Sequence, residues 1–393
     1  MIKNVTKTAG ASLALLLALA GCSTGSSEGV ATDAAGTSEA NESAAEIVVD
    51  AAAITPSGNV GLGKNGEEPA SVDLLQLTPE EEAKVRAGKF KAAISMQTMD
   101  IDWSRLTLQG IEDTLETLGI EVVAITDAKW DVQQQISDLQ NIITQKPDVI
   151  ISIPVDDVAT AEAYKKVSAA GIKLIFIHMP AFGLQYPTDY QSVIAPDNQG
   201  NGQIAAAALS EYIPEDGVVG IVNFGVDFYT TNQRTLRVNS WFAENRPDVS
   251  IKEVGFTDTN NVGPVTSDFM TANPDIDGLF IIWDSPAMQS VASLRAAGVN
   301  VPITTIDLGT EVALDMAGNG YIKAVGAQRP YDQGVAEALA AASALIGKTV
   351  PAWVALPAVA VTPGNLLESY RNIFNADAPK EIVDACNASG ICG

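Results

Sequence analysis

Short apolar runs alternate with segments of helical periodicity along most of this chain. Nine runs of five or six residues predict strands, at Lys91–Met96, Glu121–Ile125, Asp148–Ile153, Lys173–Ile177, Val218–Val222, Ile251–Gly255, Gly278–Ile282, Pro302–Ile306 and Ile322–Ala327. Between them, apolar positions recur with the period of a helix, and a glycine often follows the last of them. These segments predict helices that include Trp103–Leu118, Val132–Gln145, Ala159–Ala170 and Ser285–Ala297.

Several predicted strands are apolar on both faces, such as Val149–Ile153 and Leu174–Ile177. Strands of this kind are typical of parallel sheets that helices cover on both sides. A strand, a helix and a further strand at this spacing form a right-handed crossover within a parallel sheet. Because about 300 residues are enough for two lobes of ordinary domain size, we expect an α/β fold with two doubly wound, Rossmann-like lobes.

The N-terminus has the pattern of an export signal. Two lysines precede an apolar run, Ala11–Ala20, which is shorter than the ~20 residues of a membrane-spanning helix. Leu19–Cys22 resembles the bacterial lipobox, in which the cysteine thiol receives a diacylglycerol and becomes the first residue of the mature protein. We therefore expect residues 1–21 to be a lipoprotein signal peptide and Cys22 to be a lipid anchor to the cell membrane, outside the cytoplasm. The alternative is an ordinary signal peptide with an incidental cysteine.

Residues 22–77 are predicted to form a linker between the anchor and the folded part. Ser23–Ala45 is rich in small and polar residues, and the remainder is expected to be extended and loosely packed. Gly58–Asn65 matches a nucleotide phosphate-binding loop except at Asn65, where that loop has Ser or Thr. No buried strand precedes it, so we interpret it as linker. Order begins at Thr78–Glu81, a capping box with proline at the first helical position.

The composition limits the partners and cofactors. Acidic residues number 48 and basic residues 23, which gives a net charge of −25. Since nucleic-acid-binding proteins carry basic patches, we expect no nucleic-acid partner. Cys386 and Cys392 lie close together near the C-terminus, which predicts a local disulfide in an exported protein. The single histidine, His178, and two thiolates do not complete a zinc site, so we expect no metal and no cofactor.

Ligands of open parallel sheets bind beyond the carboxyl ends of the strands. Carboxylates, amides and arginine pair with hydroxyl groups, and aromatic faces cover the C–H faces of a sugar ring. The residues that follow the predicted strands therefore suit a polyhydroxylated ligand; they include Asp102, Trp103, Asp156, His178, Phe228, Trp283, Asp284, Asp307 and Gln328.

Some of these side chains also have a structural explanation. Asp156 and Asp284 stand where a carboxylate caps the next helix, and Trp103 stands where a helix begins and enters the core. Asp307 and Gln328 have no evident structural use, which favours a role in binding.

Residues 89 to about 375 resemble the periplasmic sugar-binding proteins of the ribose-binding type, the receptors of ABC importers. The resemblance rests on seven sequence motifs that occur in the same order as in the family. They are Gln135–Gln140, Ile151–Asp156, Ala169–Ile172, Ala195–Asn198, Asn273–Asp277, Ala296–Gly298 and Gly326–Gly334. The resemblance implies a type I periplasmic-binding fold, in which two lobes joined by a three-stranded hinge hold a sugar between them.

The resemblance also implies where the lobes divide. The N-terminal lobe is expected at residues 78–196, completed by 329–356, and the C-terminal lobe at 197–328, completed by 357–393. The three crossings are expected near Ala195–Asp197, Gln328–Pro330 and Ala355–Pro357.

Four family positions carry over to residues that match them here. Trp103 matches the ring-stacking aromatic, Asp307 the aspartate of the second lobe, and Gln328 the hinge glutamine. The family's arginine matches Arg234, with Arg237 as the competing register.

Two positions depart from the family pattern. His178 and Met179 replace an Asp-Arg pair, and Trp283 replaces an asparagine. The changes remove polar anchors and add stacking area, so we expect a deoxy or branched sugar rather than ribose. Thr304–Gly309, Ala327–Tyr331 and Val354–Pro357 further resemble a branch of the family that serves pentose-like and deoxy sugars. The alternative for His178 is a local hydrogen bond with no part in binding.

The resulting hypothesis is a monomeric, non-enzymatic receptor that delivers a monosaccharide to an ABC permease powered by a cytosolic ATPase. One rival is a sensor that presents a sugar to a membrane kinase or chemoreceptor. A second is a glycosidase that uses Asp284 and Asp307 as paired carboxylates. A third is a sugar-responsive repressor, against which the export signal argues.

Overall fold

The computed structural model describes residues 47–393. The predicted signal peptide, Cys22 and the first part of the predicted linker lie outside the described residues. No helix within residues 47–393 has the length and apolarity needed to cross a bilayer.

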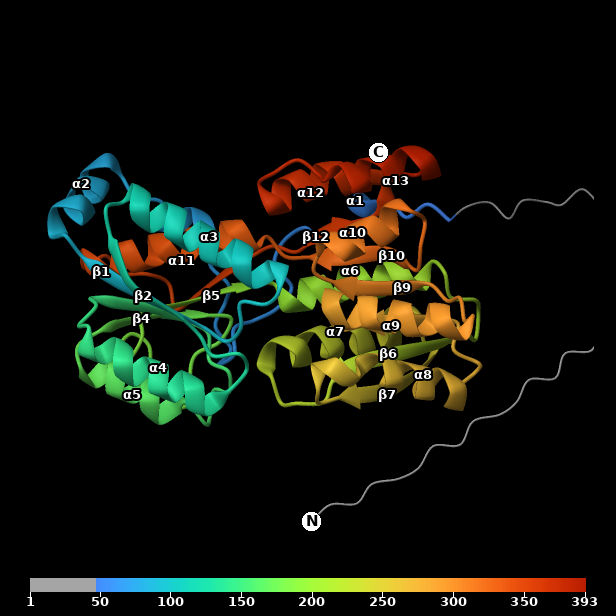
Figure 1. Cartoon of the computed structure of the whole chain (residues 1–393), viewed down its shortest axis with the longest axis horizontal. Coiled ribbons are helices and arrows are strands. Elements are labelled where there is room, and N and C mark those ends of the chain that lie inside the picture. The colour runs from blue at the N-terminus through green and yellow to red at the C-terminus, as the bar shows by residue number, and fades with distance from the viewer. Residues whose placement is uncertain (1–46) are drawn as a thin grey trace, which may run out of the picture. The chain divides into compact units, whose positions relative to one another are not determined.

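The described part contains two six-stranded sheets (Figure 1). Sheet A has the order β11-β5-β4-β3-β1-β2, with β1 (Lys91–Met96), β2 (Glu121–Asp127), β3 (Val149–Ser152), β4 (Lys173–Ile177), β5 (Ser192–Pro196) and β11 (Trp353–Leu356). Sheet B has the order β12-β10-β9-β8-β6-β7, with β6 (Val218–Phe224), β7 (Ser250–Phe256), β8 (Gly278–Ile281), β9 (Ile303–Ile306), β10 (Ile322–Ala327) and β12 (Val359–Val361). Every pairing is parallel except the one between β10 and β12. The prediction of two parallel-sheet α/β lobes is confirmed.

Helices cover both faces of sheet A, because alternate residues of its strands enter two separate apolar clusters. Ile94 and Ile151 pack under α3 (Asp102–Thr117) and α11 (Pro330–Leu345), on one face. Ala93 and Ile150 pack against α4 (Val132–Thr144) and α5 (Ala161–Ala169), on the other. The remaining helix of this lobe, α2 (Pro79–Gly88), begins with the predicted capping box.

Helices also cover sheet B, and the strands and helices of this lobe share one large apolar cluster. The helices of this lobe are α6 (Asn198–Ser210), α7 (Tyr229–Asn245), α8 (Val262–Ala272), α9 (Asp284–Ala297), α10 (Thr310–Ala317), α12 (Leu366–Phe374) and α13 (Lys380–Ser389). Short elements complete the chain: α1 (Ala51–Ile54), η1 (Val72–Leu75), η2 (Thr259–Asn261) and η3 (Pro363–Asn365).

The chain passes between the two sheets three times. The passages lead from β5 to α6, from β10 to α11, and from β11 to β12. The sequence pattern predicts nine strands and misses β5, β11 and β12. All three are short strands of the crossings, and proline ends β5 and flanks β11, which weakens the strand signal.

The predicted linker is not free beyond residue 46. Its backbone pairs with the edge of sheet A, where Ala70 donates to the carbonyl of Trp353 at 3.0 Å and accepts from Ala355 at 3.1 Å. The Gly58–Asn65 loop also packs on the body, because the N–H groups of Val60 and Gly61 donate to the Asp197 carboxylate. A loop that resembles a phosphate cradle therefore binds a carboxylate of its own chain, at the first crossing.

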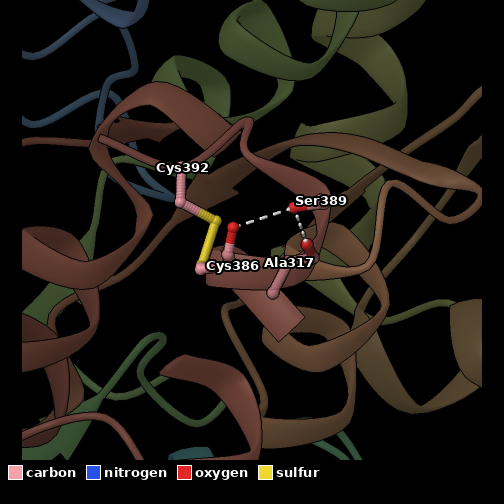
Figure 2. The surroundings of a disulfide bond; sticks show 4 residues. All are labelled: Ala317, Cys386, Ser389 and Cys392. Atoms are coloured by element: carbon pink, nitrogen blue, oxygen red, sulfur yellow. Dashed lines mark hydrogen bonds between the residues drawn. A yellow bond between two sulfur atoms is a disulfide. The ribbon is translucent and has the colours of Figure 1, made fainter. Parts of the chain in front are cut away.

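A disulfide closes the C-terminal end of the chain (Figure 2). Cys386, in α13, is bonded to Cys392, six residues further on. Ser389 donates from Oγ to the carbonyl of Ala317 at 2.7 Å, which holds α13 against the end of α10.

Removing this cross-link is expected to lower the free energy of unfolding by about 2 kcal/mol, because a short closed loop limits the entropy of the unfolded chain only modestly. Thermal denaturation of a Cys386→Ala/Cys392→Ala variant measures the effect. Reductant should lower the melting temperature of the parent protein and leave that of the variant unchanged. Equal sensitivity of the two proteins would contradict the prediction.

Candidate functional site

A narrow pocket, partly open to solvent, lies at the carboxyl ends of strands from both sheets. Its lining residues come from both lobes and are Asp102, Trp103, Leu106, Asp284, Asp307, Leu308, Gly309, Gln328, Pro330 and Ile373. Five of the nine ligand-binding residues predicted from the sequence therefore lie on its wall. Leu106, Leu308 and Ile373 were not predicted, since an apolar residue inside a helix or loop carries no sequence signal that separates pocket from core.

Asp307 is held by two partners at the base of the pocket. The Arg234 guanidinium, on α7, lies 3.6 Å from Asp307 Oδ2, and Gln328 donates from Nε2 to Oδ1 at 2.5 Å. Arg234 is 3% exposed and also donates to Asn198 Oδ1 at 3.2 Å and to the Ile282 carbonyl at 3.3 Å. Burial raises the pKa of Asp307, and the charge of Arg234 opposes that rise. The network fixes a carboxylate and an amide at the carboxyl ends of β9 and β10.

Arg237, the competing arginine, lies one turn further along α7 and faces away from this network. It donates to Gln203 Oε1 at 2.8 and 3.1 Å and pairs with Glu244 at 3.0 Å. The structure therefore places Arg234, and not Arg237, beside Asp307.

Asp284 is the first residue of α9 and is 8% exposed. Its Oδ1 accepts from the Ser285 N–H at 2.7 Å, while Trp283, at the N-cap, makes no side-chain cap bond. Burial and the neighbouring carboxylates of Asp307 and Asp102 raise the pKa of Asp284 to about 8. The capping interpretation applies instead to Asp156, whose Oδ1 accepts from two N–H groups at 2.8 and 2.9 Å in the turn before α5.

The raised pKa of Asp284 predicts a pH dependence of stability. The folded state keeps its proton up to about pH 8, whereas the unfolded state releases it above 3.8. The free energy of unfolding should therefore fall as pH rises between these values, and Asp284→Asn should lessen that fall. Urea denaturation from pH 4.5 to 9 measures it, with the exposed Asp268→Asn on α8 as control. Parallel profiles for Asp284→Asn and the parent would contradict the prediction.

Trp103 lines the pocket, and His178 packs against it without reaching the wall. Their ring centroids lie 4.7 Å apart, and both residues are buried. Burial and the charge of Arg234 lower the pKa of His178 to about 3, so the imidazole is neutral. Its Nδ1 lies 3.4 Å from Thr230 Oγ1, which is on α7 of the other lobe, so the local hydrogen bond of the alternative interpretation is replaced by a contact between the lobes.

Phe228 and Trp283 lie behind the pocket rather than on its wall. Trp283 packs against Phe224 at 5.4 Å and Phe256 at 5.5 Å between ring centroids. Phe228 packs against Trp130 at 6.0 Å and belongs to the cluster under α3 and α11. Both rings therefore shape the walls from within the core.

Two contacts at the pocket join the lobes. Asp102, at the start of α3, accepts at Oδ2 from the N–H and the hydroxyl of Thr310, at the start of α10, both at 3.2 Å. Thr310 also lies 3.3 Å from the hydroxyl of Tyr370 on α12, the helix that contributes Ile373 to the pocket. The C-terminal segment thus takes part in the site, which its sequence does not indicate.

Two buried polar atoms of the lining have no hydrogen-bond partner within residues 47–393. They are the Trp103 Nε1 donor and the Gln328 Oε1 acceptor. Since buried polar groups are normally paired, these atoms are suited to meet polar groups of a ligand. Over the same described range, no group of three or more His, Cys, Asp or Glu side chains is arranged to hold a metal ion.

Comparison with known proteins agrees with this architecture. Residues 92–349 match the periplasmic binding protein domain. The ribose import binding protein RbsB of Bacillus subtilis is 24% identical over 68% of this chain and 86% of its own length. A putative rhizopine-binding protein of Rhizobium meliloti is 24% identical over 70% of this chain and 90% of its own.

Solved structures show the same fold. A solute-binding protein of an ABC transporter from Agrobacterium vitis, bound to α-D-tagatopyranose, has a TM-score of 0.66 at 22% identity, over 74% of this chain and all of that one. Another from Actinobacillus succinogenes, bound to D-allose, has a TM-score of 0.63 at 26% identity, over 70% and 98%. These relatives are solute-binding proteins and not enzymes. The family model spans more than half of the sequence, and the chain belongs to the periplasmic binding protein family, with the type I fold.

Proposed function

We propose that this protein is the receptor of an ABC importer, which captures a monosaccharide outside the cytoplasm and delivers it to a membrane permease. The observation that carries the proposal is the polar network Arg234–Asp307–Gln328, whose Asp307 and Gln328 line a pocket between residues of both lobes. A ligand in such a pocket bridges the lobes and shifts their population toward the closed form. A diacylglycerol on Cys22 keeps the receptor near its permease.

The ligands named for the relatives support the sugar class. They include ribose, D-allose and α-D-tagatopyranose. In this chain a neutral His178 and Met179 stand at the position of the family's Asp-Arg pair. With fewer polar anchors there, the pocket favours a pentose-like, deoxy or branched sugar over ribose.

A thermal-shift screen tests the proposal. The mature chain, with Cys22→Ser so that no lipid is attached, is heated with pentoses, deoxyhexoses, branched sugars and polyols. A ligand at 100 times its dissociation constant stabilises the fold by about 2.7 kcal/mol, which raises the melting temperature by a few degrees. A hit that Asp307→Ala abolishes supports the proposal, and no hit across the panel contradicts it. Uptake into vesicles that contain the permease then separates delivery from sensing.

A further inference from the structure

One of the three carboxyl groups that line the pocket, that of Asp284, has no cation partner among residues 47–393. Three of the pocket's lining residues are carboxylates, and none is Lys, Arg or His. Asp102 pairs with Arg105, and Asp307 pairs with Arg234. Over residues 47–393, no ion pair joins Asp284 to a cation, although it is only 8% exposed.

The polar atoms of the lining are mainly acceptors. Besides the three carboxylates, the lining includes Gln328, which is 3% exposed. Its acceptor Oε1 has no hydrogen-bond partner in the described part of the chain. Among the lining residues, Trp103 Nε1 is the buried hydrogen-bond donor that has no partner in the described part of the chain. A ligand that satisfies this set must donate more hydrogen bonds than it accepts.

We propose that the ligand is a polyhydroxylated molecule with a protonated amine, an amino sugar or an aminocyclitol, whose ammonium group lies against Asp284. An ammonium group supplies three donors and a positive charge, which pairs with the ionised form of Asp284. The inference deepens the proposed function and rests on it, since it names the chemical class within the sugar-like ligands.

The proton balance at Asp284 is consistent with this assignment. Burial and the carboxylates of Asp307 and Asp102 raise its pKa, so the empty pocket holds a proton on Asp284 at neutral pH. Among residues 47–393, the charge of Asp284 acts on the Arg234 guanidinium, which already forms an ion pair with Asp307. An arriving ammonium replaces that proton, which passes to the solvent, and leaves a charge-assisted hydrogen bond.

The rest of the lining suits the hydrocarbon face of such a ligand. Trp103, Leu106, Leu308 and Ile373 present apolar surface in the same pocket. Ring C–H groups pack against these side chains while the polar groups meet the carboxylates. The pocket therefore has one face for each side of an aminated ring.

Calorimetry with matched ligand pairs tests the proposal. Each pair differs only in an amine or a hydroxyl: 3-amino-3-deoxy-D-ribose with D-ribose, D-glucosamine with D-glucose, D-galactosamine with D-galactose, and an aminodeoxyinositol with inositol. The protein is the mature chain with Cys22→Ser. In at least one pair we expect the amine to bind at least tenfold more tightly. In Asp284→Asn the preference should fall below threefold, while the exposed Asp268→Asn keeps it.

The outcomes separate the inference from the proposed function. Hydroxyl compounds that bind as tightly as their amines, or more tightly, overturn the inference and leave the proposed function standing. An amine preference that survives Asp284→Asn also overturns it, because the ammonium then lies elsewhere. If no member of any pair binds, the inference fails, and the thermal-shift panel decides the proposed function separately. Thermal denaturation checks that Asp284→Asn is folded. If the variant does not fold, the comparison of amine with hydroxyl compounds on the parent protein still tests the inference.

Discussion

Replacing Arg234 with methionine is expected to lower the affinity for the sugar by more than about 100-fold and the free energy of unfolding by about 3 kcal/mol. Methionine keeps the apolar stem of the side chain and removes the guanidinium. Asp307 then loses the cation 3.6 Å away while its side chain stays only 13% exposed, and a largely desolvated charge without a partner destabilises the fold. Calorimetry with the sugar from the screen and urea denaturation measure the two effects.

Arg237→Met is the matched control, because it removes the same group from the same helix. Arg237 contacts Gln203 and Glu244 and lies outside the pocket lining. We expect its affinity to stay within about twofold of the parent, since surface ion pairs contribute little. If Arg237→Met lost binding and Arg234→Met kept it, the assigned register of the family's arginine would be wrong.

Gly334→Ala is expected to destabilise the N-terminal lobe by about 3 kcal/mol, although alanine is the better helix former. Helix α11 packs so closely on α3 that a Cβ at Gly334 would lie 2.1 Å from the Thr107 carbonyl oxygen and 2.8 Å from the Ile111 nitrogen. Both atoms belong to the backbone and cannot rotate away as a side chain can, so the two helices must move apart. Urea denaturation, read by circular dichroism, measures the loss.

Gly58→Ala controls for the change of residue type. A Cβ at this exposed glycine meets nothing within 4 Å, so we expect its free energy of unfolding to stay within about 0.5 kcal/mol of the parent. Gly110→Ala, which faces the Tyr331 carbonyl at 2.2 Å across the same helix pair, should repeat the loss. A stable Gly334→Ala protein would show that the helices pack less closely than described.

The sequence by itself determined the fold class and most of its elements. All nine predicted strands occur. In sheet A, alternate side chains of the strands enter clusters on opposite faces. The capping box at Thr78 and the helix that ends at Gly298 follow from local backbone chemistry. Asp307 and Gln328 were predicted as site residues because each follows a parallel strand, and the carboxyl ends of parallel strands lie at one edge of the sheet.

The tertiary structure alone decided which side chains meet. Helical spacing does not separate Arg234 from Arg237, and only the packing of α7 places the first beside Asp307. Residues 47–77 pack on the body although their composition is that of a linker, because their partners, such as Asp197 and Ala355, are distant in sequence. Contacts of this kind depend on three-dimensional proximity, which local patterns do not encode. For the same reason, Ile373 in the pocket and Trp283 behind it were visible only in the folded chain.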